Sequence, residues 1–389
     1  MSEENQETTE KSGSYQSRIR RRRILIVLGV AFAIFLTVLL YVILVRYTDY
    51  ESLSQKEMVD SAQTKYEEFE GGFVAYSLDG VSYIDRNGDV LWNESYEMLH
   101  PVVRKCEGHI VVYDRQGTMI KSLDKLGVRT TIYTTMPVTE ADIAENGSIA
   151  VLMQEGDTGH LQIYNVAGQI SASGEMHLSS GGYPIDLALS HDGKRLAASA
   201  MDLVNGEVRA KLIYYDFGSA GAEKDKYIVA TVTYSDTVMP EIDFVKGDRL
   251  LCICDKGVHI FDNKDNPEEI ENITSPGQII SIVHNDSYIV MVANRQNEEG
   301  RIEETMWIYS LSGRPVSEIV LEDSFEDIYI TDDNAVILSD GQNVSIYNLF
   351  GVKRFSYSFT DAVFKMLSTG RYREYILIRT GSMERIKVR

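Results

Sequence analysis

The chain has 389 residues, of which 44% are apolar, and its formal net charge is -20 at pH 7. From Tyr47 onward it holds 31 basic and 54 acidic residues, and a surface that acidic repels nucleic acid and excludes it as an expected partner. Three cysteines are too few for a disulfide-stapled fold; Cys252 and Cys254, in the strand-like stretch LLCICD, are predicted to be buried.

The N-terminal part of the sequence predicts a membrane anchor. Residues 1–23 are predicted to form a disordered basic tail, and the 22 residues from Ile24 to Val45 carry no charge. A helix of that length spans about 33 Å at ~1.5 Å per residue, which matches a hydrocarbon core of roughly 30 Å. The stretch is longer than the apolar region of a cleaved signal peptide, so an uncleaved transmembrane helix over 24–45 is favoured.

The orientation of this helix follows from the basic residues that precede it. Lys and Arg are retained on the cytoplasmic side of a membrane. The N-terminus is therefore expected inside the cell and everything past residue 46 outside it, with the bilayer itself as one partner. The determinants of this topology are Arg20, Arg21, Arg22 and Arg23.

Residues 46–71 predict a short juxtamembrane helical stalk. The segment has no Gly or Pro before Gly71, and its apolar positions recur at near-helical spacing. A role in oligomerisation is an open alternative, although the pattern does not form sustained heptads. These positions are Leu53, Met58, Val59, Ala62, Tyr66 and Phe69.

Residues 72–389 predict an all-β domain built from repeats. Apolar and polar residues alternate along short segments, with turn residues every eight to twelve positions. A strand with an aromatic residue and a following polar turn recurs at spacings of roughly forty residues, the period of β-propeller blades. Its copies centre on Val81, Met119, Leu161, Leu212, Val258, Met306, Val344 and Arg385.

The two ends of this domain determine the number of blades. FVAYS, VSYID and VLWN at the start correspond to the second, third and fourth strands of a blade, and FKML, YILIR and ERIKV at the end to the first, second and third. Since one shared blade would duplicate two strands, eight blades are expected, with seven as the alternative. Turn pairs such as Asn146-Gly147 and Asp192-Gly193 supply the positive φ that tight hairpins require.

Two short stretches resemble known propellers. LSHDGKRLAAS, residues 189–199, resembles the inner hairpin of WD40-like propellers, and YIDRNGDVLW, residues 83–92, is similar to the repeat of quinoprotein-like propellers. With Trp92 and Trp307 alone, the chain departs from the Trp in every blade of quinoprotein enzymes. The whole layout resembles an uncharacterised family of single-pass, membrane-anchored propeller proteins of Gram-positive bacteria, which implies an extracytoplasmic location and supplies no catalytic residues.

No residue pattern in the sequence points to a specific chemistry. The seven histidines are scattered singly, and GxSxG, P-loop and GxGxxG patterns are absent. Acidic pairs such as Asp332-Asp333 lack the spacing of an EF-hand loop. No catalytic, cofactor-binding or metal-binding residue is therefore predicted, and no cofactor.

The sequence predicts a binding surface at the stretch Met201–Lys226, which carries the longest insertions, because long loops on a rigid scaffold often bind partners. The candidate rim residues are Tyr183, Pro184, Asn205, Tyr214 and Tyr215.

Three functional hypotheses follow. The first is a non-enzymatic binding or scaffold module outside the cell membrane that engages a cell-envelope protein or a wall polymer. The alternative is a propeller enzyme, a quinoprotein-like oxidoreductase or a glycan lyase or hydrolase, which a central pocket holding His, Arg and carboxylates from several blades would favour. A transmembrane sensor is disfavoured by the short cytoplasmic tail.

Overall fold

In the computed structural model the chain divides into two units, which comprise residues up to Arg46 and residues Tyr47–Arg389. In the first unit, residues 25–38, 40–41 and 43–44 are helical. Among the described residues, no helix combines the length and the apolar character needed to cross a membrane. The predicted tail over 1–23, its arginines and Ile24 lie outside the described residues, which are 25–38, 40–41, 43–58, 63–156, 158–177, 182–222, 224, 227–247, 249–322 and 324–389.

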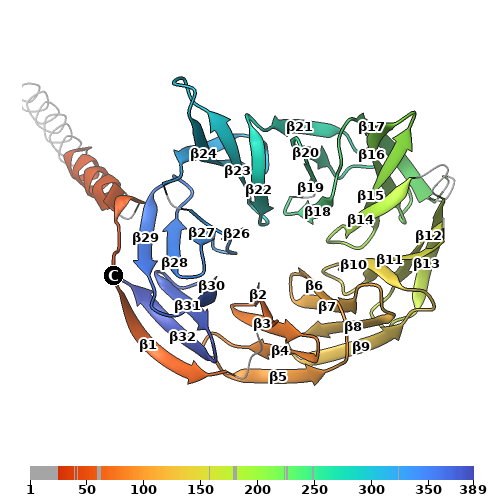
Figure 1. Ribbon diagram of the computed structural model, residues 1–389, viewed down its shortest axis with the longest axis horizontal. Coiled ribbons are helices and arrows are strands. Elements are labelled where there is room, and N and C mark those ends of the chain that lie inside the picture. Colours follow the sequence, from red (N-terminus) through yellow and green to blue (C-terminus); the bar gives the residue numbers. More distant parts are fainter. Residues whose placement is uncertain are drawn as a thin grey trace, which may run out of the picture. The chain divides into compact units, whose positions relative to one another are not determined.

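The second unit is an eight-bladed β-propeller. Its described residues form eight four-stranded antiparallel sheets, arranged around a central axis (Figure 1). Each sheet is one blade, and its first strand lies nearest the axis. The predicted all-β, eight-bladed architecture is therefore confirmed.

Seven blades are continuous in sequence, with strands in chain order from the axis outward. Blades 1 to 4 comprise β2 (Lys65–Phe69), β3 (Gly72–Ser77), β4 (Gly80–Ile84), β5 (Val90–Ser95); β6 (Pro101–Cys106), β7 (His109–Asp114), β8 (Met119–Asp124), β9 (Gly127–Tyr133); β10 (Val138–Ile143), β11 (Ile149–Glu155), β12 (Thr158–Tyr164), β13 (Ile170–His177); and β14 (Tyr183–Leu189), β15 (Arg195–Val204), β16 (Glu207–Asp216), β17 (Ile228–Ser235). Blades 5 to 7 comprise β18 (Glu241–Val245), β19 (Arg249–Cys254), β20 (Gly257–Asp262), β21 (Glu269–Thr274); β22 (Gln278–His284), β23 (Tyr288–Gln296), β24 (Ile302–Ser310), β25 (Pro315–Val320); and β26 (Asp327–Ile330), β27 (Val336–Ser339), β28 (Asn343–Tyr347), β29 (Lys353–Ser358).

Blade 8 is built from both ends of the propeller sequence. Its inner strands are β30 (Val363–Ser368), β31 (Glu374–Arg379) and β32 (Ser382–Val388), and its outermost strand is β1 (Tyr50–Glu57). β1 runs antiparallel to β32, with Tyr50 opposite Val388 and Glu57 opposite Ser382 (Figure 1). This pairing closes the ring with backbone hydrogen bonds between two segments far apart in the sequence.

The predicted helical stalk over 46–71 is wrong, and the propeller begins before residue 72. The segment supplies β1 and β2, which are the strands that the sequence assignment left missing from blades 8 and 1. The helical spacing was misleading because the two apolar residues of β2 lie on opposite faces of the strand. Tyr66 packs between blades 8 and 1, whereas Phe69 packs between blades 1 and 2, so two residues three apart are both buried without a helix.

The core consists of apolar layers between successive blades. Between blades 3 and 4, for example, Leu152 of β11 packs in one cluster with Leu196 of β15, and both side chains are fully buried. A lone blade would expose these faces, and stacking the blades in a ring buries them. Cys252 and Cys254 lie together in the layer between blades 4 and 5, which confirms that these thiols are buried.

The antiparallel strands give the propeller two distinct faces. The turns between second and third strands lie on one face, which we call the hairpin face and which carries residues 205–206 and 297–301. The turns between first and second strands lie on the opposite face. The chain enters the propeller there at Tyr47, whose backbone bridges Phe355 at the start of β29, and we call it the Tyr47 face.

Candidate functional site

A polar cavity with a volume of about 740 Å³ lies on the axis. Its lining comes from the first strands and from the first turns of the blades, which places it toward the Tyr47 face. The lining residues include Arg86, Arg104, Lys105, His191 and His284. They also include nine acidic residues, namely Glu67, Glu68, Glu70, Glu107, Asp142, Glu241, Asp243, Asp286 and Asp332.

Arg104 is the basic group that faces the carboxylates of the middle blades. It projects from β6, and its Nη2 lies 3.5 Å from Oδ1 of the buried Asp186 on β14. Burial alone would lower the pKa of Arg104, but the negative charges of Asp186, Asp142 and Asp243 outweigh it and raise the pKa. The guanidinium therefore partly neutralises a ring of acidic side chains from blades 3 to 5.

His284 forms a second charged cluster, at the end of β22. Its Nε2 lies 3.6 Å from Oε1 of Glu241 and 3.8 Å from Oδ2 of Asp243. Burial would lower the pKa of His284, but the hydrogen bond with Glu241 and the charge of Asp243 raise it. The same hydrogen bond lowers the pKa of Glu241. This cluster can hold a proton on the axis, and the Nδ1 of His284 is buried without a hydrogen-bond partner among the described residues.

Two buried carboxylates of the first strands, one on blade 3 and one on blade 4, bind the backbone of the next blade. Asp142 on β10 accepts a hydrogen bond of 2.7 Å from the backbone N–H of Leu189 on β14. Asp186 on β14 accepts one of 2.9 Å from the backbone N–H of Ile242 on β18. Burial is the largest cause that raises the pKa of each to about 7. These side chains connect blade 3 to blade 4 and blade 4 to blade 5.

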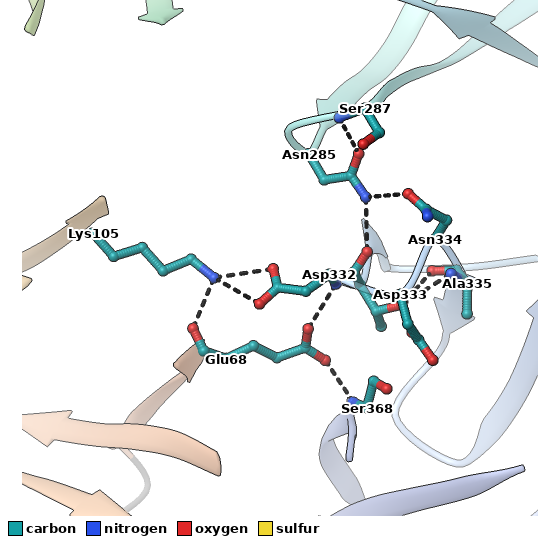
Figure 2. A network of polar contacts seen from close by, with 10 residues as sticks. Glu68, Lys105, Asn285, Ser287, Asp332, Asp333, Asn334, Ala335 and Ser368 are labelled. Carbon is teal, nitrogen blue, oxygen red and sulfur yellow. Dashed lines mark hydrogen bonds and ion pairs between the residues drawn. The ribbon is translucent and has the colours of Figure 1, made fainter. Parts of the chain in front are cut away.

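Glu68 makes the corresponding connection at the ring closure (Figure 2). Its Oε1 accepts a hydrogen bond of 2.5 Å from the N–H of Ser368, and its Oε2 accepts one of 2.8 Å from the N–H of Asp332. Lys105 donates to the carbonyl oxygen of Glu68 at 2.7 Å and to Oδ1 of Asp332 at 3.2 Å. One buried side chain of blade 1 is thereby bound to blades 7 and 8. Burial raises its pKa to about 7.

The side-chain amide of Asn285 connects blade 6 to blade 7 in the same region. Asn285 donates from Nδ2 to the carbonyl oxygen of Thr331 at 2.8 Å and to Oδ1 of Asn334 at 2.9 Å (Figure 2). Its own Oδ1 accepts from the N–H of Ser287, which fixes the turn that presents it. The polar groups at the axis therefore act mainly on the backbone of neighbouring blades.

These hydrogen bonds limit the chemistry that the axial cavity can perform. Asp142, Asp186 and Glu68 already accept hydrogen bonds from backbone N–H groups, so they are committed to holding blades together. Arg104, Glu241, Asp243 and His284 are left as groups that could bind or exchange a proton with a ligand. Within the described ranges, no three His, Cys, Asp or Glu side chains converge in a way that could hold a metal ion.

The structure separates the rim residues suggested by the sequence. Tyr183 is 44% exposed at the start of β14, and Asn205 is exposed in the turn between β15 and β16. Pro184 is buried, and Tyr214 and Tyr215 are 1% and 4% exposed, so these three cannot form a rim surface. The two tyrosines face opposite sides of β16, and each packs into an apolar layer between blades.

The two predicted insertions also lie far apart. Residues 201–209 extend the hairpin of β15 and β16 at the hairpin face, whereas the connection after Asp216 begins at the opposite end of β16. A ten-residue strand is about 34 Å long at ~3.4 Å per residue. The insertions therefore cannot contribute to one binding surface.

Sequence reasoning missed the channel residues, although a signal for them was present. An Asp with apolar neighbours occurs in the first strands of three successive blades, in ADIA, IDLA and IDFV, at Asp142, Asp186 and Asp243. Charged residues are seldom fully buried without partners, so a carboxylate repeated at the innermost strand indicates an axis-facing position.

The fold and the axial cavity place the protein in the class of eight-bladed β-propellers. In this propeller, polar side chains at the axis connect neighbouring blades. Residues 43–388 match the family of unknown function DUF5711, and the chain belongs to that family. No curated protein matches the chain.

Three solved structures illustrate the likeness of fold. BamB from Moraxella catarrhalis has a TM-score of 0.51 at 12% identity, over 87% of this chain and 100% of that chain. Sqt1 from Saccharomyces cerevisiae has a TM-score of 0.55 at 12% identity, over 88% and 99%. Raptor from Chaetomium thermophilum has a TM-score of 0.50 at 9% identity, over 90% of this chain and 29% of that chain. At these identities the likeness concerns the fold alone.

Proposed function

We propose that the protein is a membrane-anchored, extracytoplasmic propeller that serves as a non-enzymatic binding or scaffold module for another protein of the cell envelope. The observation that carries the proposal is an exposed apolar surface on blade 4. Tyr183 lies directly opposite Met201 in the sheet, and Leu203 follows on the same face of β15. The three side chains, which we call the blade 4 patch, are 44%, 39% and 69% exposed.

The blade 4 patch has the chemistry of a protein contact. β15 and β16 have ten residues each, longer than most strands of the propeller, so their hairpin projects at the hairpin face. Contiguous exposed apolar side chains on a rigid element are typical of surfaces that bind other proteins. The strongly acidic remainder of the surface would exclude anionic partners from most other positions.

The membrane anchor and the extracytoplasmic location are part of the proposal. The 22 uncharged residues that follow four consecutive arginines support a membrane segment with the propeller outside the cell. Carbonate extraction of membranes would test the anchor. Protease treatment of intact cells would test the location, since an extracytoplasmic propeller is cleaved without cell lysis.

The binding hypothesis is tested by crosslinking the tagged full-length protein in cells and purifying it with its partners. We expect one reproducible partner that is lost from Leu203→Asp and retained by Leu126→Asp, because Leu126 is 81% exposed and lies on blade 2. A partner signal that disappears after digestion of the wall would assign the contact to a wall polymer. No reproducible partner, or equal loss in both variants, would reject the blade 4 patch.

The polar channel favours the enzyme as a second candidate. Arg104, His284 and carboxylates from several blades meet on the axis, as expected for a propeller with an axial site. Titration with pyrroloquinoline quinone tests the quinoprotein-like version, which requires binding that is lost in Arg104→Gln. Release of reducing sugars from wall polymers, lost in His284→Gln, tests the glycan-cleaving version. Failure of both would leave the binding module.

A further inference from the structure

A second pocket lies at the junction of blades 7 and 8, on the Tyr47 face. It has a volume of about 190 Å³, which corresponds to roughly six water molecules at ~30 Å³ each. Its basic side chains are Arg354 at the start of β29 and Arg373 just before β31. The pocket is also lined by Tyr47, Tyr372 and Asp333.

Both arginines are stacked on the same two tyrosines. The guanidinium carbon of Arg354 lies 5.5 Å from the ring centre of Tyr47 and 5.8 Å from that of Tyr372. The guanidinium carbon of Arg373 lies 5.0 Å and 5.4 Å from the same two rings. The tyrosine hydroxyls are 3.2 Å apart. Nη2 of Arg354 also donates a hydrogen bond of 3.3 Å to the Tyr372 hydroxyl. These contacts orient the guanidinium groups, and each guanidinium has five N–H donors, so further donors remain for a ligand.

The charge of this pair is not neutralised by an ion pair. Among the described residues, neither Arg354 nor Arg373 has a carboxylate within ion-pair distance, and Nε of Arg373 is buried without a hydrogen-bond partner. The pocket lining contains one carboxylate, Asp333, whose Oδ1 accepts a hydrogen bond of 2.6 Å from Thr331. The pocket is therefore locally cationic in a strongly acidic domain.

Two further observations agree with a positive potential and with a strained site. Burial would raise the pKa of the Tyr47 hydroxyl, but hydrogen bonds with Tyr372, Arg373 and Arg354 outweigh it and lower the pKa. Arg373 has a backbone φ of 64°, in the left-handed region that is unfavourable for a non-glycine residue. The fold holds this arginine at the pocket in spite of that cost.

We propose that this pocket, which we call the double-arginine pocket, binds a phosphate-bearing anion. The planar N–H edges of two guanidinium groups match the oxygens of a phosphate, and Arg is the preferred residue for such contacts. The inference goes beyond the proposed binding function and uses a different face of the propeller. Two sources share this chemistry, a free phosphate compound and a lipid headgroup. The second is relevant because Tyr47 follows the uncharged stretch by two residues in the sequence.

The test uses the purified full chain in a non-ionic detergent, with inorganic phosphate and glycerol phosphate as probes at constant ionic strength. Calorimetric titration should show saturable binding to the wild type. Arg354→Gln and Arg373→Gln should each weaken it at least about tenfold, because each removes charge-assisted hydrogen bonds. Arg301→Gln, which removes the same charge from an exposed turn on the hairpin face, should bind like the wild type.

Arg354→Lys guards against loss of folding, because it keeps the charge and removes the planar fork. It should retain the thermal midpoint of the wild type and still bind phosphate more weakly. The proposal is overturned if the wild type gives no saturable binding, or if Arg301→Gln and Arg354→Gln bind equally. Reconstitution in bilayer discs then assigns the source. Phosphate binding that is blocked by phosphatidylglycerol but not by phosphatidylcholine assigns a lipid headgroup, and unblocked binding assigns a free phosphate compound.

These outcomes are independent of the proposed function. If the chain does not enter the discs, the anchor is rejected while the titration in solution still tests the pocket. If phosphate binds and the blade 4 patch has no partner, the pocket stands without the scaffold role.

Discussion

Blades 3 and 4 contact each other in two different ways. Away from the axis, Leu152 and Leu196 meet in an apolar layer, which is non-directional and tolerates small sliding movements. At the axis, Asp142 accepts a hydrogen bond from the backbone of Leu189, which is directional but costs the desolvation of a carboxylate. The comparison indicates that the apolar layers supply most of the stability, whereas the axial carboxylates determine how adjacent blades are aligned.

The largest expected effect comes from the apolar layer. Leu196→Ala should lower the free energy of unfolding by about 2–5 kcal/mol, because it removes a fully buried side chain and leaves a cavity. Leu126→Ala is the matched control at an exposed position and should change it by less than about 0.5 kcal/mol. Guanidinium denaturation of the full chain measures both. Equal effects would show that the layer between blades 3 and 4 is not a major source of stability.

The next effect comes from the axial connection at the ring closure. Glu68→Ala leaves the N–H groups of Ser368 and Asp332 without their acceptor, at about 1–3 kcal/mol for each buried donor. Glu68→Gln keeps one acceptor oxygen and should lose less. Amide hydrogen exchange at Ser368 and Asp332 provides the local readout. If exchange at these amides does not change in Glu68→Ala, the axial carboxylate does not align blades 7 and 8 with blade 1.

A smaller effect should appear as a dependence of stability on pH. Asp142 and Asp186 have pKa values of about 7, mainly because of burial, against about 3.9 in an unfolded chain. The native state therefore binds more protons between these values, so their contribution to stability is complete below about pH 4 and is lost as the pH rises through about 7. We expect the thermal midpoint to rise when the pH is lowered from 8 to 5.

Asp186→Asn tests the origin of this dependence. Its amide oxygen can still accept the hydrogen bond from Ile242, but it no longer titrates, so the rise toward pH 5 should become smaller. Glu299→Gln removes one exposed charge and should leave the slope unchanged. A wild-type slope in Asp186→Asn would assign the pH dependence to the overall negative charge of the domain.

The smallest effect concerns a surface contact across the ring closure. Lys56 of β1 forms an ion pair of 2.7 Å with Asp89 of blade 1, and both side chains are substantially exposed. Lys56→Ala should therefore cost less than about 1 kcal/mol. A double-mutant cycle with Asp89→Asn, repeated at high salt, isolates the pair. A coupling that is large and insensitive to salt would make this surface contact comparable to the axial connections.

The sequence was sufficient for the repeat but not for its two incomplete ends. Strands such as β4 and β28 were recognisable because buried apolar residues, an aromatic residue and a turn recur together. β1 was not, because it is an outer strand with little burial, and only its pairing with β32 makes it a strand. β2 was not recognised because one of its buried positions is Glu68, so its apolar residues, Tyr66 and Phe69, do not alternate in the sequence.

The functional site was harder to predict from the sequence for a related reason. Tyr214 and Tyr215 were expected on the rim, yet adjacent residues of an inner strand face two different blades, and both are buried. The double-arginine pocket joins Tyr47 to residues more than three hundred positions away. No local pattern contains that information, because the ring closure brings these residues together.

The pairing of β1 with β32 also determines when the ring can close during biosynthesis. β1 is complete at residue 57, but its partner strand ends at Val388. At ~5–20 residues per second, a ribosome needs roughly 17 to 66 seconds to make the intervening chain. Throughout that interval β1 lacks its native partner, so the nascent protein is exposed to mispairing until β32 emerges. A message truncated before β32 would produce a propeller that cannot close through this pairing.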